Sequence, residues 1–165
     1  MKRNRGSAND HARRGRDKPW LWLILAMATI LPLKAPAEEP IGQVKTQAGA
    51  VTVQRGGKIL PLALGDHVYR SDTVSTAARS SVGITFADNS LMSLGPFSRL
   101  SLEQFRFDTT THAGAFELSL RRGTMAVKSG QIVRQTPEAM RVRTPAALLG
   151  VRGTEFVVRA DGAEQ

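Results

Sequence analysis

The sequence predicts an all-β domain of short strands that follows an N-terminal signal peptide. From residue 41 onward, apolar and polar side chains alternate in brief stretches, and turn residues recur about every 8–12 positions. No window of about 11–18 residues in that region keeps a helical period. A sandwich, a barrel or a short solenoid fits this pattern.

The N-terminal segment has the layout of a secretory signal peptide. Residues 1–19 are polar and basic, residues 20–33 are almost continuously apolar, and Ala35-Pro36-Ala37 supplies small residues for cleavage after Ala37. The apolar stretch is shorter than the ~20 residues that a membrane span needs. An uncleaved signal anchor is the alternative, and Arg13-Arg14 leaves export by the twin-arginine route open.

The charge of the chain is concentrated in this segment. The net charge is +9, from 23 Lys and Arg against 14 Asp and Glu. Residues 1–37 hold eight of the basic and two of the acidic side chains, a net of +6. The remaining excess does not indicate a nucleic-acid partner. There is no cysteine, which excludes disulfides and thiolate chemistry.

The first half of the domain contains three clear strand signals. Val51–Val53 precedes Gly56-Gly57, and the alternating stretch Val82–Phe86 precedes the turn Asp88-Asn89-Ser90. Further on, the pair Leu100 and Leu102 is out of phase with the pair Phe105 and Phe107. Because a strand shows alternate residues to opposite faces, a bulge or break is expected near Glu103-Gln104.

The second half is expected to hold four more strands. The face of Phe116, Leu118 and Leu120 ends at Arg121-Arg122-Gly123, and shorter strands follow at 125–127, 140–142 and 154–158. Residues 146–149 could form one helical turn. Asp161-Gly162 signals a hairpin, but only three residues follow. We therefore expect an unpaired edge near 154–159, or a chain shorter than its relatives, and treat 161–165 as a tail.

No catalytic, cofactor-binding or metal-binding site is predicted. The sequence has no G-x-S-x-G elbow and no phosphate-binding glycine loop. Asp66, His67 and Asp72 could gather round a metal, but each aspartate follows Gly65 or Ser71 and suits a turn, where it accepts a backbone hydrogen bond. The phenylalanines in phase with apolar neighbours are expected in the core: Phe86, Phe107, Phe116 and Phe156.

Two basic clusters have two interpretations. Arg121-Arg122 with Lys128, and Arg141 with Arg143, either lie on solvated strand faces or bind an acidic partner or an anionic glycan.

Several motifs in order carry a resemblance to a known family. They are Gly42-Gln43-Val44, Leu64–Val68, Ser71–Thr76, Phe86–Leu91 and Val142–Phe156. On these motifs, residues 41–160 resemble the FecR domain. The resemblance implies an all-β module with a solenoid-like stack of short strands on the outer side of the cytoplasmic membrane. It also implies protein–protein interaction and not catalysis.

The sequence departs from the signalling members of that family at both ends. Residues 1–19 are too short for an anti-sigma region, and no receptor-facing domain follows Asp161-Gly162. We therefore expect an exported, non-enzymatic module, periplasmic or secreted, whose partner is an envelope protein or a cell-wall glycan. The alternative is an anti-sigma-like regulator of iron-uptake signalling, anchored in the inner membrane by residues 20–33.

The last motif is interpreted as structural. Thr144-Pro145 ends one strand, Gly150 and Gly153 permit backbone conformations or close approaches that side chains forbid, and Arg152 is expected to join neighbouring turns through Asp66, Asp72 or Glu155. The full set of expected motif residues is Gly65, Asp66, Asp72, Thr144, Pro145, Gly150, Val151, Arg152, Gly153, Thr154, Glu155 and Phe156.

Overall fold

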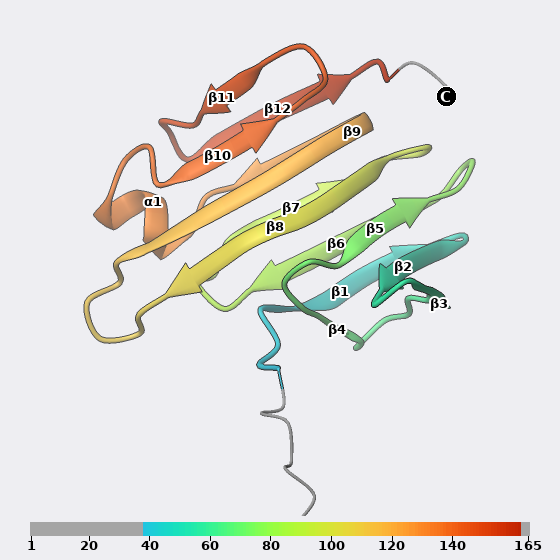
Figure 1. Cartoon of the computed structure of the whole chain (residues 1–165), viewed down its shortest axis with the longest axis horizontal. Coiled ribbons are helices and arrows are strands. Elements are labelled where there is room, and N and C mark those ends of the chain that lie inside the picture. The colour runs from blue at the N-terminus through green and yellow to red at the C-terminus, as the bar shows by residue number, and fades with distance from the viewer. Residues whose placement is uncertain (1–37, 163–165) are drawn as a thin grey trace, which may run out of the picture. The chain divides into compact units, whose positions relative to one another are not determined.

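The computed structural model describes residues 38–162, so the predicted signal peptide, residues 1–37, lies outside the described residues. Within them, no helix is long and apolar enough to span a membrane. The expected all-β class is confirmed (Figure 1). The described elements are β1 (Gly42–Ala48), β2 (Val51–Arg55), β3 (Lys58–Pro61), β4 (His67–Val68), β5 (Thr73–Thr76), β6 (Ser81–Phe86), β7 (Leu91–Leu94), β8 (Arg99–Phe107), β9 (Gly114–Lys128), α1 (Gln131–Gln135), β10 (Met140–Arg143), β11 (Leu148–Gly150) and β12 (Glu155–Ala160).

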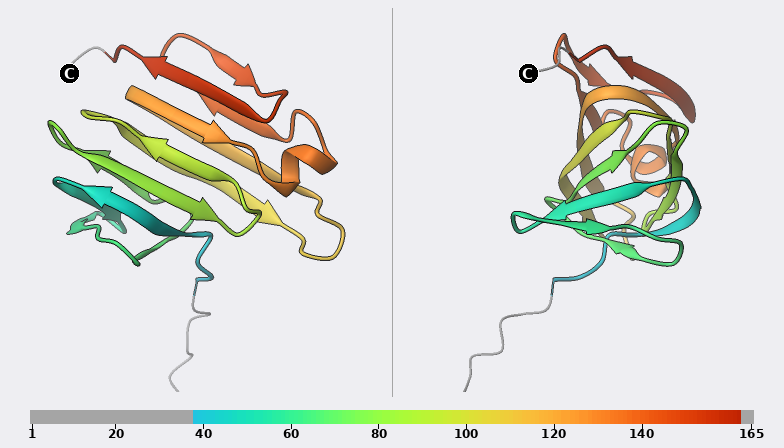
Figure 2. Two further views of the ribbon diagram at one scale, coloured as in Figure 1. Left: turned by 180° about the vertical axis from the view of Figure 1, so that it is seen from behind. Right: turned by 90° about the vertical axis from the view of Figure 1, so that its right-hand side faces the viewer.

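The strands form one curled sheet with the order β3-β2-β5-β8-β9-β7-β6-β1-β4. The long strand β9 joins two walls. The β8 wall contains β2, β3, β5, β8, the first part of β9, β10 and β11, whereas the β7 wall contains β1, β4, β6, β7, the later part of β9 and β12. The walls curl around a common interior (Figure 2). The chain crosses between the walls from β1 to β2 and from β5 to β6, whereas β2 and β3, and β6 and β7, are antiparallel hairpins within one wall, so the sheet is a curled half-barrel.

The core fills the space between the walls. Phe86 from the β7 wall meets Phe116 from the β8 wall edge to face, with ring centroids 4.7 Å apart. Phe105 joins them, with its centroid 4.9 Å from that of Phe116. Such pairs contribute about 0.5–1.5 kcal/mol beyond the apolar area they bury. Of the four phenylalanines expected here, Phe86 and Phe116 are buried, and Phe107 and Phe156 are partly buried against the core.

The predicted irregularity in β8 is confirmed. The pairing of β8 with β9 shifts between Leu102 and Gln104, which leaves Glu103 as the extra residue. The bulge lets Leu102 and Phe105 both face the interior, although they are three positions apart.

The predicted end of a strand at Arg121-Arg122-Gly123 is wrong, because β9 runs on to Lys128. Gly123 has φ +92°, and a Cβ there would lie 2.2 Å from the hydroxyl oxygen of Ser98. Glycine tolerates both the conformation and the close approach. The strand therefore bends at Gly123 and passes from the β8 wall to the β7 wall while its pairing with neighbouring strands continues.

The predicted helical turn is also misplaced. Residues 146–149 are not helical, because the hydroxyl of Thr144 accepts a hydrogen bond from the backbone N–H of Ala147 at 3.1 Å and turns the chain into β11. The described helix is instead α1, which buries Ile132 and Val133. Its five residues are too few to establish a helical period in the sequence.

Candidate interaction site

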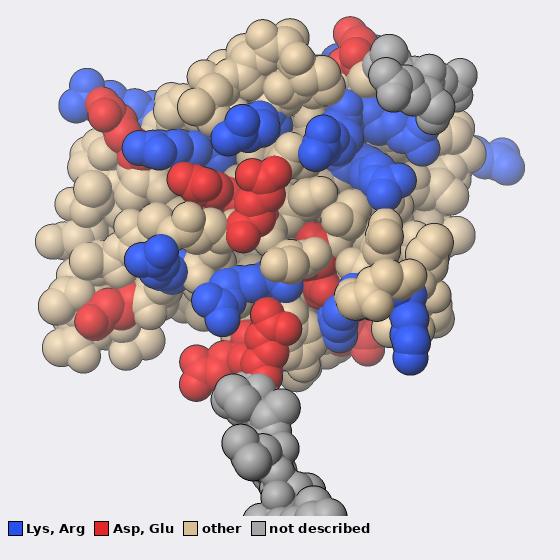
Figure 3. Space-filling view, viewed as in Figure 1, with Lys and Arg blue, Asp and Glu red and all other residues tan. Residues whose placement is uncertain are grey.

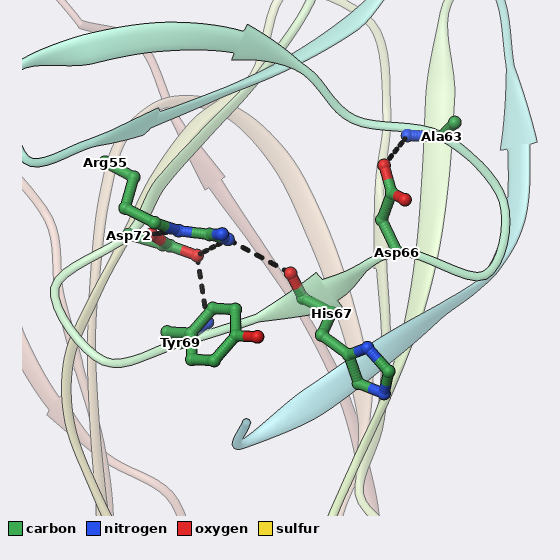
Figure 4. Close-up of polar contacts among 6 residues, drawn as sticks. All are labelled: Arg55, Ala63, Asp66, His67, Tyr69 and Asp72. Atoms are coloured by element: carbon green, nitrogen blue, oxygen red, sulfur yellow. Dashed lines mark hydrogen bonds and ion pairs between the residues drawn. The ribbon is translucent and has the colours of Figure 1, made fainter. Parts of the chain in front are cut away.

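Asp72 is the centre of a polar cluster at the turn before β5 (Figure 4). Its carboxylate is fully buried and accepts two hydrogen bonds from Arg55, at 2.8 Å from Nε and 2.7 Å from Nη2. The backbone N–H of Tyr69 donates to the same carboxylate at 2.8 Å. Arg55 also donates to the carbonyl of His67 at 3.0 Å and stacks over the Tyr69 ring, 4.3 Å from its centroid. The hydrogen bonds with Asp72 raise the pKa of Arg55, because they favour the charged form of its guanidinium.

The Gly65-Asp66 turn is also closed by an aspartate carboxylate that accepts a backbone hydrogen bond. Gly65 has φ +88°, and the carboxylate of Asp66 accepts a hydrogen bond from the backbone N–H of Ala63 at 2.7 Å. Asp66 and Asp72 are thus both occupied by local backbone donors, as the turn interpretation predicts. In the described part of the chain, no three His, Asp or Glu side chains gather in a way that could hold a metal ion.

The motif after β11 mixes structural and exposed positions. Val151 is buried, and its N–H donates to the carbonyl of Met140 at 3.0 Å. Gly153 has φ +135°, which favours glycine. The carbonyl of Thr154 accepts a hydrogen bond from the backbone N–H of Ser129 at 2.7 Å, and Phe156 packs at the edge of the core.

Two expectations about this motif are wrong. Arg152 is exposed, and within residues 38–162 it forms no ion pair with Asp66, Asp72 or Glu155. Asp72 already has Arg55, which comes from a strand distant in sequence. Gly150 has no positive φ, and a Cβ there would meet nothing within 4 Å, so its backbone does not require glycine.

A polar groove of about 500 Å³ lies on the outer face of the β8 wall. We name it the arginine groove, and its lining residues are Gln54, Gly56, Gly57, Ser71, Thr73, Arg99, Ser101 and Arg121. The β-ladders align Gln54, Thr73 and Ser101 in one row across β2, β5 and β8. Arg99 stands directly opposite Arg122 of β9, with Arg121 as the extra residue of a bulge. Figure 3 shows Lys and Arg side chains spread over this face.

The arginines of the groove differ from their neighbours in having no carboxylate partner. Arg141 pairs with Glu117 at 3.5 Å and Arg143 with Glu103 at 4.0 Å. Among the described residues, Arg99 and Arg121 form no ion pair, and no acidic residue lines the groove. Guanidinium groups and hydroxyls in this arrangement suit the oxygens of a carboxylate, phosphate or sulfate.

The sequence identified this site only in part. Arg121-Arg122 was expected to form a basic cluster with Lys128, but Lys128 lies on the β7 wall and pairs with Glu155 at 3.2 Å. Arg99 was missed, because its position opposite Arg122 depends on the register of β8 and β9. The isolated motif Ser98-Arg99-Leu100 gives no signal of that position.

The fold and these surfaces define a curled all-β module whose open polar groove suits binding. The chain belongs to the FecR family, since the family described as FecR protein matches residues 72–165. FecR domains are typically non-catalytic signalling or regulatory modules. No curated protein and no solved structure matches the chain.

Proposed function

We propose that this FecR-family chain is an exported, non-catalytic binding module of the cell envelope. Its partner is an envelope protein or a cell-wall glycan that presents an anionic group to the arginine groove. The observation that supports this proposal is the pair Arg99 and Arg121, which line one groove without a carboxylate among its lining residues.

The register supports a binding role for these arginines. Like charges at facing positions of a sheet destabilise it, and Arg99 stands opposite the bulge of β9 that contains Arg122 and the groove residue Arg121. The ion pairs of Arg141 and Arg143 offset charge on the same face, but they do not reach the groove. An anion bound between the guanidinium groups of Arg99 and Arg121 would relieve the repulsion. Thr73 and Ser101 hydrogen-bond each other at 3.0 Å, and Gln54 accepts from Arg99 at 3.1 Å. The remaining donor and acceptor positions of these side chains would contact a polymer lying along the row.

Binding of the purified chain to three polymers tests the proposal: poly-glutamate, polygalacturonate and neutral dextran. We expect the two anionic polymers to bind, with affinity falling as salt rises, and dextran not to bind. Replacing both Arg99 and Arg121 by Met should weaken binding about tenfold or more, since each charged hydrogen bond contributes about 1.5–3 kcal/mol.

The matched control is Arg141→Met, which removes a cation of the same wall that already has a carboxylate partner. It should change affinity by less than about threefold, as expected for an exposed ion pair. Equal weakening by Arg141→Met and by the double variant would indicate a diffuse charge effect and contradict the groove. Preference for poly-glutamate or for polygalacturonate separates a protein partner from a glycan.

The alternative is a membrane-anchored FecR-type regulator in which residues 20–33 stay uncleaved. Both tryptophans, Trp20 and Trp22, precede the expected cleavage after Ala37. A soluble periplasmic species that begins at Glu38 and lacks tryptophan fluorescence would support the exported module. A full-length, fluorescent species in the membrane fraction would support the regulator.

A further inference from the structure

We propose that β12 pairs with β12 of a second copy of this chain, antiparallel, about a two-fold axis at Val157. The proposed interface is an edge of the β7 wall and shares no residue with the arginine groove. The inference therefore stands independently of the proposed anionic partner.

The backbone of β12 presents an open edge. Among the described residues, β9 is the only strand that pairs with β12. Strand β12 therefore forms one edge of the β7 wall, and β4 forms the opposite edge (Figure 2). The N–H of Ser129 donates to the carbonyl of Thr154, so the even-numbered residues of β12 direct their backbone groups toward β9. The backbone N–H and C=O groups of Glu155, Val157 and Arg159 therefore point to the open edge.

The same three residues place their side chains on the outer face, where all are exposed. Glu155 and Arg159 stand symmetrically on either side of Val157. If two copies pair antiparallel with Val157 opposite Val157, each Glu155 lies opposite Arg159 of the other copy. Both ends of the interface then bring opposite charges together, and the outward-pointing backbone groups fall into hydrogen-bonded pairs.

Other registers lose this complementarity. A shift of two residues in one direction sets Glu155 against Val157, and a shift in the other direction sets Val157 against Arg159. A shift of one residue places a backbone group of the open edge against one that is already bonded to β9. The charge pattern of the strand thus selects one register, and that register is self-complementary.

Exposed apolar surface at the centre of β12 also favours pairing with a second copy of this chain. The side chain of Val157 is 68% exposed, although it lies in a regular strand. It ends the row Ser93–Ala126–Val157 across β7, β9 and β12, beside a groove of about 350 Å³ that Leu91 also lines. Pairing with a second copy would set Val157 against Val157 and extend the row into the other sheet.

The ion pairs that each copy already makes are compatible with the interface. Glu155 pairs with Lys128 at 3.2 Å and Arg159 with Asp161 at 3.1 Å, but all four side chains are well exposed, so these pairs contribute little. In the dimer, Glu155 would lie between Lys128 of its own copy and Arg159 of the other. This arrangement keeps each carboxylate beside a cation.

Charge reversal followed by sedimentation equilibrium tests the pairing. Over about 1 µM to 1 mM chain, the wild type should show a concentration-dependent dimer. Glu155→Arg and Arg159→Glu should each raise the dissociation constant about tenfold or more, because two attractive pairs become two repulsive ones. Mixing these two variants should restore dimerisation, since the arginine introduced in one chain then faces the glutamate introduced in the other. The double reversal E155R/R159E should restore dimerisation within a single variant.

Two further variants keep the test decisive. Val157→Pro removes an N–H that points to the open edge and not to β9, so it should abolish dimerisation while the thermal unfolding of the monomer stays cooperative. Asp161→Asn removes the partner of Arg159 within its own chain and should leave the dimer intact. A wild type that stays monomeric at the highest concentration, or single charge reversals that dimerise as well as the wild type, would overturn the proposal.

Discussion

Arg55 holds the fully buried carboxylate of Asp72 through two hydrogen bonds of 2.7 and 2.8 Å, across 17 positions of sequence. The pair joins the end of β2 to the turn before β5, and Tyr69 lies against both partners. Arg55 is 36% exposed, whereas Asp72 has no contact with solvent. Loss of the arginine would therefore leave a buried carboxylate with only a backbone donor.

We predict that Arg55→Met lowers the free energy of unfolding by about 3 kcal/mol, near the lower end for breaking a buried ion pair because Arg55 is partly exposed. Urea unfolding measures this loss. Arg99→Met is the matched control, since Arg99 is exposed and forms no ion pair within the described residues, and it should change stability by less than about 0.5 kcal/mol. Equal effects of the two variants would show that the ion pair does not stabilise the turn.

The bend of β9 at Gly123 provides a second prediction. Gly123→Ala places a Cβ against Ser98 in a left-handed backbone conformation, so it should destabilise the domain by about 1–3 kcal/mol. Gly150→Ala is the control, because its Cβ would meet nothing within 4 Å and its φ is not positive. That variant should be neutral or stabilising by up to about 1 kcal/mol. Thermal unfolding measures the stability of the two variants. A Gly150→Ala protein as unstable as the Gly123→Ala protein would contradict a specific role for the close packing of Gly123 on Ser98.

Local patterns in the sequence predicted local structure well. The alternation in residues 82–86 indicated β6, and the phase shift between Leu102 and Phe105 indicated the bulge at Glu103. The aspartates at 66 and 72 accept backbone hydrogen bonds from residues three positions earlier, as their turn context indicates. Each of these features depends on neighbours within a few positions.

Features that depend on distant pairing were not predictable in this way. Arg55 reaches Asp72 only because β2 and β5 are neighbours in the sheet. Arg99 meets Arg122 only through the register of β8 with β9. The continuation of β9 through Gly123 could not be predicted either. In the sequence, a glycine after two arginines indicates a turn, and only the packing against Ser98 and the second wall shows that the strand continues.

The turn between β8 and β9 should respond to acid. The pKa of Asp108 is lowered, chiefly because the backbone N–H groups of Thr111 and Thr110 donate to its carboxylate at 2.9 and 2.8 Å. A lowered pKa in the folded state means that this contribution to stability is present above the unfolded pKa of about 4 and is lost as the pH falls through the folded value. We expect protection of the Thr110 and Thr111 amides from hydrogen exchange to fall on that acidification.

Asp108→Asn is the control for the acid response. The amide oxygen can still accept a hydrogen bond, but the side chain no longer titrates. Protection of the same two amides should then be independent of pH over that window. An identical acid response in the variant would assign the effect to another group.

Arg152 provides the last prediction, because the sequence suggested a buried tie between turns and the structure places the residue in solvent. Arg152→Ala should change the free energy of unfolding by less than about 0.5 kcal/mol. Val151→Ala, one position earlier, removes buried apolar carbon and should cost about 1.5 kcal/mol. Chemical denaturation of the two variants side by side distinguishes the positions. If Arg152→Ala unfolds while Val151→Ala is tolerated, the guanidinium has a structural partner, and the motif is held together by charge and not by the packing of Val151.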